Sequence, residues 1–530
     1  MIACKDKNTP DNPGGGSGEP NDTIGNKVDD LNWTDTLYIT WSGNTATVTG
    51  EVDSVEVSNS NGYVRVHASM KRLVTYILSG NGTGQFTIYG SIKHNLTLDG
   101  LTLTCTDGPA INNQCHKKCF VVVKGTNSLT DGSSYATSTE DRKAALFSEG
   151  QVIFSGSGSL TVKGNYKHAI ASDDYIHLTD GLTGTLNLTA ATDGLHANDA
   201  IFINGGTTSI TAGSDGVECD STITIEGGSL TISADGDGIQ SDTTDILING
   251  GTINITNAGD KGIVAFRNIT INGGTIRVSS EYKCIKAGKK ENNRIVSAGN
   301  IHITDGDIQV ICNGEAVGGG GGPWGGSSSS DSSKPEGIEA KGTIIIDGGY
   351  VYVQSADDAI NAAGDMTVNG GCIMAYSTDN DGLDANGNMY INSGLIYAIC
   401  AGSPEVALDA NTEGGKRLYV QGGTIIALGD LERGASLAQA CYQNSSWTAE
   451  TWYSITVGSE TFAFKTPKKQ SNGGGGPGGR SKQTPLVVSG SSKPTVKSGV
   501  SVSGGTTIFN GMGVLQGSVS GGSTVTLSNY

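Results

Sequence analysis

The sequence predicts an all-β protein that folds as a right-handed parallel β-helix, a solenoid of about 22 to 25 residues per coil. Three observations predict this fold. A segment that begins with Asp-Gly recurs, since Gly194, Gly216 and Gly238 follow one another at intervals of 22 residues. Each segment contains short runs in which β-branched and polar residues alternate. Glycine contributes 81 of the 530 residues without a Gly-X-Y period, which indicates strands joined by tight turns rather than collagen.

Each repeat contains three short predicted strands. The first directly follows Asp-Gly, the second is an alternating run such as residues 223–225, and the third is a run such as residues 229–233. The second run ends at Gly227 and Gly228, where glycine supplies the positive φ that a sharp turn needs. Because parallel crossovers are right-handed, we expect a right-handed coil. A helical solenoid, a leucine-rich repeat and a β-propeller do not fit this unit length and pattern.

Period-2 alternation in the first strand of each coil predicts which side chains point into the core. The expected inward residues are apolar or small, and the expected outward residues are polar and stack in rows along the solenoid axis. The inward set is Leu195, Val217, Ile239, Ile263, Ala197, Cys219, Ser241 and Ala265, and the outward set is His196, Glu218, Gln240, Asn198, Asp220 and Asp242.

The amino-terminal residues 1–36 are interpreted as a lipoprotein N-terminus and a flexible tether. A small residue directly before Cys4 resembles a bacterial lipoprotein cleavage site, and a polar, glycine-containing run follows it. We therefore expect an exported protein that is held at the cell surface or outer membrane by a lipid on Cys4. The alternative is a cytosolic start in which this cysteine is incidental.

The rest of the chain divides into three predicted parts. Residues 37–465 form the carbohydrate-binding solenoid, with a loop at 291–299, a Gly/Ser-rich insertion at 318–335 and an irregular stretch at 434–454 for which a short helix is an alternative. Residues 466–485 read as a glycine-rich linker, and residues 486–530 as a carboxy-terminal β segment that packs on the solenoid.

Charge and composition exclude several classes of partner. Lys and Arg total 34 against 52 Asp and Glu, a formal net charge of −18, so binding to nucleic acid is not expected. No run of 18 apolar residues occurs, which leaves the lipid anchor as the expected membrane contact. Cys115 and Cys119 lack a second pair at zinc-site spacing. We expect a monomer.

The stacked acidic residues predict calcium binding. Equivalent residues on neighbouring coils lie about 4.8 Å apart, where two carboxylates repel, and a Ca²⁺ ion with oxygen ligands at about 2.3–2.6 Å fits between them. Turn chemistry is the alternative for the Asp before each Gly, but it does not account for acidic residues within strands. The predicted ligands are Asp193, Asp215, Glu218, Asp220, Asp237 and Asp242 in a first cluster and Asp358, Asp381 and Asp384 in a second.

An aromatic row marks the later coils. Positions that are polar in earlier coils hold Tyr350, Tyr352, Tyr376 and Tyr397 there. Stacked tyrosines on a flat sheet suit contact with the sugar rings of an extended polymer. Alternatively, the same patch is the surface on which residues 486–530 pack.

Several linked segments resemble the bacterial carbohydrate-binding β-helix family. They are residues 107–111, 127–132 and 156–162, the Asp-Gly coils that follow, and the closing run 498–505. The resemblance covers about residues 37–465 and implies a right-handed parallel β-helix with pectate-lyase-like architecture, associated with Ca²⁺ and with pectic or cellulosic polysaccharide. It implies calcium ligands only where the Asp-Gly rows match, and the insertion at 318–335 departs from the pattern.

Three functions remain open from the sequence. The favoured one is calcium-dependent, non-catalytic binding of acidic or cellulosic polysaccharide at the cell surface, with avidity from many weak contacts. The second is a calcium-dependent polysaccharide lyase, which needs a basic side chain to take the proton α to a uronate and would draw it from Lys261, Lys283 or Lys286. The third is a structural adhesin or surface spacer.

Overall fold

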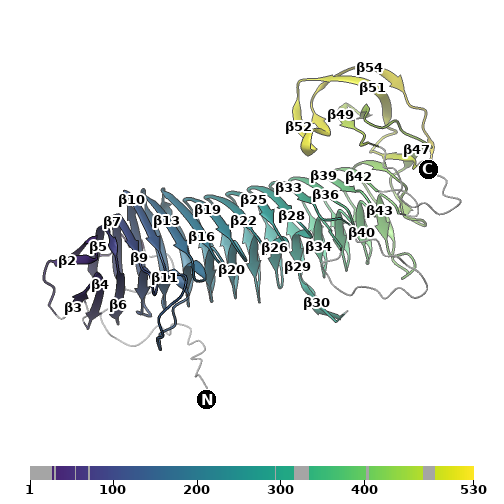
Figure 1. Cartoon of the computed structure of the whole chain (residues 1–530). Helices are drawn as coiled ribbons and strands as arrows, with labels where there is room; N and C mark the ends of the chain where they lie inside the picture. Colours follow the sequence, from purple (N-terminus) through teal and green to yellow (C-terminus); the bar gives the residue numbers. More distant parts are fainter. Residues whose placement is uncertain are drawn as a thin grey trace.

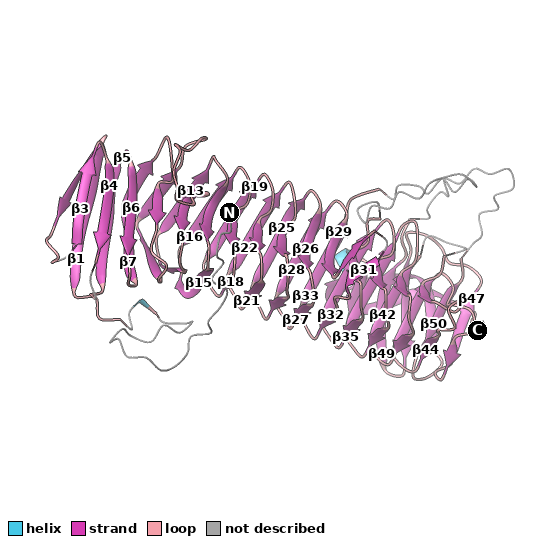
Figure 2. Cartoon of the chain, turned by 90° about the horizontal axis from the view of Figure 1, so that it is seen from below, coloured by secondary structure: helices cyan, strands magenta, loops and turns pink. Residues whose placement is uncertain are grey.

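The computed structural model of the chain describes residues 27–28, 31–53, 55–69, 72–292, 294–315, 334–400, 405–468 and 484–530. It is a long parallel β-solenoid with a separate antiparallel sheet packed beside its carboxy-terminal end (Figures 1 and 2). The solenoid has about 13 turns of about 24 residues each. The predicted all-β fold and the parallel β-helix are thereby confirmed, and the right-handedness stays a prediction.

One face of the solenoid is a 15-stranded sheet, built from the first strand of every coil and preceded by a short hairpin. Its strands are β3 (Val55–Ser60), β4 (Tyr63–Ala68), β6 (Gln85–Gly90), β8 (Ile111–Asn113), β11 (Ala144–Ser148), β14 (His168–Ser172), β17 (Leu195–Ala197), β20 (Val217–Cys219), β23 (Ile239–Ser241), β26 (Lys261–Ala265), β29 (Lys283–Ala287), β34 (Ile338–Ala340), β37 (Ile360–Ala362), β40 (Leu383–Ala385) and β43 (Leu408–Ala410).

The second strands of the coils belong to a larger, 32-stranded sheet. They are β9 (Cys119–Lys124), β12 (Val152–Gly156), β15 (Tyr175–Leu182), β18 (Ala200–Ile203), β21 (Thr222–Ile225), β24 (Ile246–Ile248), β27 (Ile269–Ile271), β32 (Ile301–Ile303), β35 (Ile344–Ile346), β38 (Met366–Val368), β41 (Met389–Ile391) and β44 (Leu418–Val420).

The third strands of the coils form the rest of that sheet. They are β10 (Thr126–Thr130), β13 (Ser159–Gly164), β16 (Thr185–Ala190), β19 (Thr207–Ala212), β22 (Ser229–Ala234), β25 (Thr252–Ala258), β28 (Thr275–Ser280), β33 (Asp307–Cys312), β36 (Tyr350–Ser355), β39 (Cys372–Ser377), β42 (Leu395–Ile399) and β45 (Thr424–Leu428).

The register places equivalent residues of successive coils side by side. Leu195 pairs with Val217, Val217 with Ile239, and Ile239 with Ile263. All four side chains are fully buried, as the alternation predicted. A column of aliphatic residues thus runs the length of the molecule as one continuous core.

The turn after the second strand uses glycine as expected. Gly228 has a φ of +75° and Gly251 a φ of +85°, values that disfavour any residue with a Cβ. This turn sends the chain into the third strand at the same place in each coil, which preserves the register of the acidic and polar rows.

Both ends of the solenoid carry strands that run against the coil direction. At the amino-terminal end β1 (Asp35–Gly43) pairs in parallel with β5 (Val74–Thr83) and antiparallel with β2 (Thr45–Thr49), while β3 and β4 form an antiparallel hairpin. β5 then pairs with β7 (His94–Thr104). At the other end β50 (Leu486–Ser489) lies antiparallel between β45 and β47 (Cys441–Asn444).

The carboxy-terminal domain is a six-stranded antiparallel sheet. Its strands are β48 (Trp452–Val457), β49 (Glu460–Lys465), β51 (Thr495–Ser503), β52 (Thr506–Ile508), β53 (Gly513–Leu515) and β54 (Ser518–Thr524), with a 3₁₀ turn η3 (Phe509–Gly511). Because β48 and β49 pair here, residues 452–465 belong to this domain and not to the solenoid as the sequence suggested. The last strand, β55 (Ser528–Asn529), returns to β47.

Two stretches differ from their predicted conformation. Residues 434–454 contain β46 (Ser436–Leu437), β47 and the start of β48 rather than a short helix. The loop at 291–299 is part of a hairpin of β30 (Lys289–Glu291) and β31 (Arg294–Ser297).

The amino-terminal segment is ordered earlier than expected. Trp33 packs edge-on against Phe120 with ring centroids 5.7 Å apart, and Val28 and Leu31 join the same cluster. β1 begins at Asp35, within the range interpreted as tether. Cys4, nearly all of the 318–335 insertion and most of the 466–485 linker lie outside the described residues. Within the described ranges there is no helix with the length and hydrophobicity of a membrane span.

Candidate functional site

The outward side chains of the 15-stranded sheet form one polar row. His196 pairs with Glu218, and Glu218 with Gln240. The row continues through Val264, Lys286, Glu339, Asn361, Asp384 and Asp409. The row predicted from His196 to Gln240 is confirmed, and its charge changes sign along the solenoid axis. This face therefore offers both anion-binding and cation-binding groups along one line.

The Asp of each Asp-Gly pair serves the backbone of the next coil. The backbone N–H of Asp215 donates to Asp193 Oδ1 at 3.0 Å, that of Asp237 to Asp215 Oδ1 at 2.6 Å, and that of Lys261 to Asp237 Oδ1 at 2.7 Å. Burial raises the pKa of Asp215 to about 7. These three predicted calcium ligands thus form a hydrogen-bond ladder between coils, which is a structural use of the carboxylate.

The acidic residues on the outward face form a separate group. Carboxylate oxygens of Glu218, Asp220 and Asp242 lie within 4.8 Å of one another. Asp220 and Asp242 are exposed, and Gln240 Nε2 donates to Asp242 Oδ1 at 2.6 Å. Of the first predicted cluster, the structure brings these three together and separates them from the ladder.

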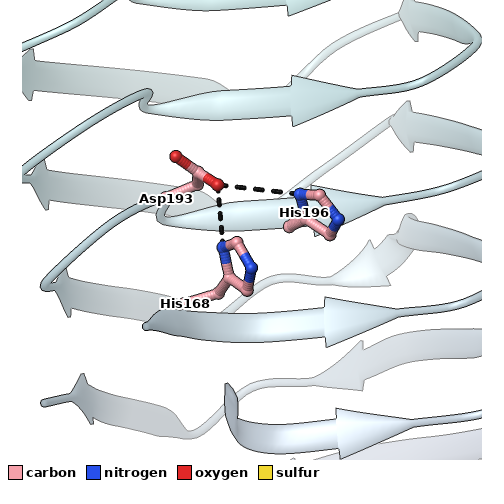
Figure 3. A group of neighbouring side chains, drawn as sticks. All are labelled: His168, Asp193 and His196. Atoms are coloured by element: carbon pink, nitrogen blue, oxygen red, sulfur yellow. Dashed lines mark ion pairs between the residues drawn. The ribbon is translucent and has the colours of Figure 1, made fainter. Parts of the chain in front are cut away.

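Asp193 lies between two histidines that the sequence analysis did not treat as ligands (Figure 3). His168 Nδ1 is 2.8 Å from Asp193 Oδ2, and His196 Nδ1 is 3.6 Å from the same oxygen. His196 Nδ1 also contacts Glu218 Oε2, and the two imidazole rings stack with centroids 4.2 Å apart. Thr192 Oγ1 lies 3.0 Å from His168 Nδ1.

Electrostatics distinguish the members of this group. Burial lowers the pKa of His168. Burial also lowers the pKa of His196, but its contacts with Asp193 and Glu218 outweigh this and raise that pKa to about 9. Burial would raise the pKa of Asp193, and hydrogen bonds with both histidines instead hold it below its ordinary value. One positive charge is therefore shared among two carboxylates and two stacked rings.

The second predicted cluster is more deeply buried. Glu336, Asp357 and Asp358 are buried with carboxylate oxygens within 4.8 Å of one another. Burial, followed by repulsion from neighbouring carboxylates, raises the pKa of Asp358 to about 6. Asp381 and Asp384 belong to the same group, since Asp358 contributes to raising both of their pKa values.

Hydrogen bonds and burial define what this second cluster lacks. Asp358 Oδ1 accepts the backbone N–H of Asp381 at 3.2 Å, so the ladder is repeated here. Burial raises the pKa of Asp381 to about 9 and that of Asp384 to about 8. Several carboxylates packed on adjacent coils thus need more positive charge nearby before they can all ionise.

The three candidate lysines are ion-paired. Lys283 is 1% exposed, with Nζ 2.6 Å from Glu336 Oε2, and Lys286 Nζ is 3.9 Å from Glu339 Oε2. Lys261 Nζ contacts Asp260 and lies 3.6 Å from Asp237 Oδ1. Burial lowers the pKa of Lys261, but these acids outweigh it and raise the pKa. A general base must be neutral and reachable by substrate, and this arrangement favours neither condition.

A polar cleft opens along the outward row beside β26 and β29. Its volume is about 340 Å³. Both charges line it, which suits hydroxyl and carboxylate groups of a sugar chain. The polar lining consists of Asp237, Gln240, Ser241, Asp242, Asp260, Lys261, Lys286, Lys289 and Lys290.

The predicted tyrosine platform is largely covered by the chain itself. Tyr352 is 4% exposed and Tyr397 is fully buried in a cluster with residues of the carboxy-terminal sheet. Tyr397 donates its hydroxyl to the carbonyl of Lys465 at 2.9 Å, and its ring centroid is 5.3 Å from that of Phe464. This packing replaces the expectation that Tyr352 and Tyr397 contact a sugar. Tyr376 is half-buried beside the same cluster, and Tyr350 remains 46% exposed.

Comparison with known proteins gives two findings. A family model described as carbohydrate-binding domain-containing protein matches residues 60–308 and 263–382, which together span more than half of the chain. Among solved structures, a polysaccharide lyase-like protein from C. thermocellum, determined as a gadolinium derivative, is 21% identical, covers 53% of this chain and 95% of its own, and has a TM-score of 0.31. No curated protein matches the sequence.

Proposed function

The chain belongs to the carbohydrate-binding domain-containing family, and from this premise we propose that its solenoid binds an acidic or cellulosic polysaccharide at the cell surface, without catalysis and in a calcium-dependent manner. The observation that carries the proposal is the polar cleft of about 340 Å³ on the outward face of the 15-stranded sheet. It lies on a row of polar side chains that repeats along the axis, as an extended polymer requires.

The charges of the cleft suit a sugar acid. Lys289 and Lys290 are exposed at its rim and supply cations for uronate carboxylates. Gln240 and Asp242 supply donors and acceptors for hydroxyl groups. Many such contacts along a rigid surface give avidity although each is weak.

Ion pairing of the lysines supports binding without reaction. Lys283 is enclosed with Glu336, and Lys261 is held charged by Asp237 and Asp260. Proton abstraction α to a uronate needs a neutral amine in contact with the sugar. Polygalacturonate incubated with the protein and Ca²⁺ is therefore expected to give no unsaturated product, and formation of such product would contradict a purely binding role.

The second acidic cluster is the best candidate to hold Ca²⁺. Its donors are all oxygens, as Ca²⁺ prefers, and a divalent cation would supply the positive charge that these buried carboxylates need. The proposed ligands are Asp358, Asp381 and Asp384, together with Glu336 and Asp357. Bound Ca²⁺ would fix the geometry of this part of the face and neutralise its repulsion for an acidic polymer.

The test is a pull-down on insoluble cellulose and on pectin, with and without a chelator. We expect retention with Ca²⁺ and release when Ca²⁺ is removed. Lys290→Ala should weaken retention because it removes a cation from the cleft, whereas Lys497→Ala, an exposed lysine on β51, should not. No retention on either polymer would overturn the binding proposal.

The metal proposal has its own control. Asp384→Asn should abolish Ca²⁺ uptake in calorimetry, whereas Asp305→Asn, at an exposed turn, should leave it unchanged. Retention that is indifferent to both the chelator and Asp384→Asn would leave binding intact and remove the calcium dependence.

Surface location is part of the same proposal. It is supported by the Ala3-Cys4 pair and the polar run that follows it. We expect the protein in the membrane fraction of its native host and its Cys4→Ser variant in the soluble fraction. Equal distribution of the two proteins would contradict a lipid anchor.

A further inference from the structure

Three successive coils bring four metal-ligating side chains to one point on the outward face (Figure 3). His168 begins β14, Asp193 precedes β17, His196 lies on β17 and Glu218 on β20. The register pairs Ile170 with Leu195, so His168 stands where the next coil has Asp193. A histidine has thus replaced one member of the Asp-Gly row, exactly beside the coil whose outward residue is also a histidine.

The donor atoms already converge. Asp193 Oδ2 lies 2.8 Å from His168 Nδ1 and 3.6 Å from His196 Nδ1, and all three donor atoms lie within 4.8 Å of one another. Glu218 Oε2 contacts His196 Nδ1 from the opposite coil. Ligand atoms bound tetrahedrally at about 2.0–2.2 Å from one Zn²⁺ ion are separated by about 3.3 Å, so small side-chain adjustments suffice to seat the ion.

The donor types decide which metal fits. Two imidazole nitrogens with one or two carboxylates are typical of Zn²⁺ and related first-row divalent ions, whereas Ca²⁺ takes oxygen ligands. Each of the four side chains is at most 14% exposed, so the site is shielded from bulk water. Here the sequence-based expectation of calcium at Asp193 and Glu218 meets a donor set of different chemistry.

We propose that His168, Asp193, His196 and Glu218 form a Zn²⁺ site that links three consecutive coils of the solenoid. The ion would take the place of the protons that now hold the two histidines to the carboxylates. It would lie on the same outward row as the polysaccharide cleft but independently of it, and independently of the proposed calcium cluster.

The test uses the full chain, stripped with a chelator and dialysed. Titration with ZnCl₂ in excess CaCl₂ is expected to show saturable uptake of one Zn²⁺ per chain and a rise in melting temperature. Co²⁺ as a probe should give the strong visible absorption of a tetrahedral site. His168→Gln and His196→Gln should each weaken Zn²⁺ binding by at least about 10-fold.

Two further variants keep the result decisive. His302→Gln, on the exposed pair of His302 with Asp347, is the matched control and should bind Zn²⁺ as the parent protein does. Asp193→Asn retains an oxygen to accept the backbone N–H of Asp215, so it preserves the ladder while weakening the site, and it serves if a histidine variant does not fold. Absence of Zn²⁺ uptake by the parent protein, or uptake that survives Asp193→Asn and the folded histidine variants, would overturn the proposal; Ca²⁺ uptake at Asp384 is unaffected in either case.

Discussion

His94 is a titratable side chain enclosed near the amino-terminal end of the solenoid. It is 2% exposed, its ring lies edge-on to Tyr76 with centroids 6.2 Å apart, and Nδ1 is 3.4 Å from the carbonyl of Ile92. Burial lowers its pKa from 6.5 to about 4. Between these two pH values the unfolded chain binds a proton at this residue that the folded chain does not.

Folding stability should therefore fall as pH drops from 6.5 to 4, because protons bind preferentially to the unfolded state. The contribution of His94 to this loss is expected to be about 3 kcal/mol, at about 1.4 kcal/mol per unit of pKa difference. Urea unfolding followed by tryptophan fluorescence at pH 7 and pH 4 would measure it. His94→Phe should lose less stability over this range than the parent protein does.

The control for this prediction is a histidine at the surface. The side chain of His116 is 79% exposed, so His116→Gln should leave the acid-induced loss unchanged. Equal pH dependence in the parent protein and in His94→Phe would contradict the role of burial at this residue.

At this scale the sequence could predict which residues share a row but not which atoms meet. Stacking of Asp193, Asp215 and Asp237 follows from their common interval, yet their use as acceptors for the next coil's N–H depends on backbone geometry. His168 was missed because its coil is longer: 25 residues separate it from Asp193, and the 22-residue interval does not align the two. The residue-by-residue frame at Ala169 was the available clue.

The first strand of each coil depends on close packing at the Asp-Gly glycine. A Cβ added at Gly216 would meet Ile232 Cγ2 at 2.4 Å and the carbonyl oxygen of Gly238 at 2.6 Å. Ile232 lies sixteen residues after Gly216; sixteen residues after Ala359, which occupies the equivalent place in another coil, stands the small Ala375. The size of one residue is thus matched to the size of the other.

Gly216→Ala should destabilise the solenoid by about 1–3 kcal/mol through overpacking. Gly382→Ala is the matched control, because its added Cβ meets a carbonyl oxygen at a similar 2.7 Å but its nearest side-chain atom, Ala398 Cβ, only at 3.3 Å. Urea unfolding of both variants compares them. In a double-mutant cycle, Gly216→Ala combined with Ile232→Ala should cost less than the sum of the two. Strict additivity would refute the size match.

Elements with a local pattern were predictable, and elements with distant partners were not. Alternation and glycine pairs define the coil strands, because each strand's partner lies one coil away. β47 instead pairs with β50 and β55, which follow it by more than 40 residues, so nothing within residues 434–454 marks it as a strand. The same holds for β48, whose partners β49 and β51 form a separate sheet.

The whole molecule consists of the solenoid and the carboxy-terminal sheet that packs on its later coils (Figure 1). The interface is aromatic: Phe464 is fully buried between Tyr397 of the solenoid and Tyr453 of its own sheet, at centroid distances of 5.3 and 5.5 Å. Apolar burial of this kind holds the two parts together.

Phe464→Ala should weaken this docking by about 3–5 kcal/mol, the usual cost of removing a buried aromatic ring. Hydrogen exchange should then show loss of amide protection in β48, β49 and β51, while the early coils around β17 and β20 stay protected. Tyr350→Ala, at a residue that is 46% exposed, is the control and should change neither. Loss of protection throughout the solenoid would show that the two parts unfold as one unit.

At this largest scale the sequence predicted a solenoid followed by a packed β segment, but it left the tyrosine row undecided between ligand and domain. Only the burial of Tyr352 and Tyr397 under the carboxy-terminal sheet distinguishes these uses. The position of the polysaccharide cleft was equally hidden, because it combines charges from several coils whose side chains meet only after folding.

The reversed strands at the two extremities of the solenoid limit how copies of the protein can associate. A stack of coils with bare extremities would offer a template on which another copy could add, and growth would continue into a filament. β2 and β50 run in the opposite direction to the coils and occupy that template. We therefore expect separate particles even in concentrated solution.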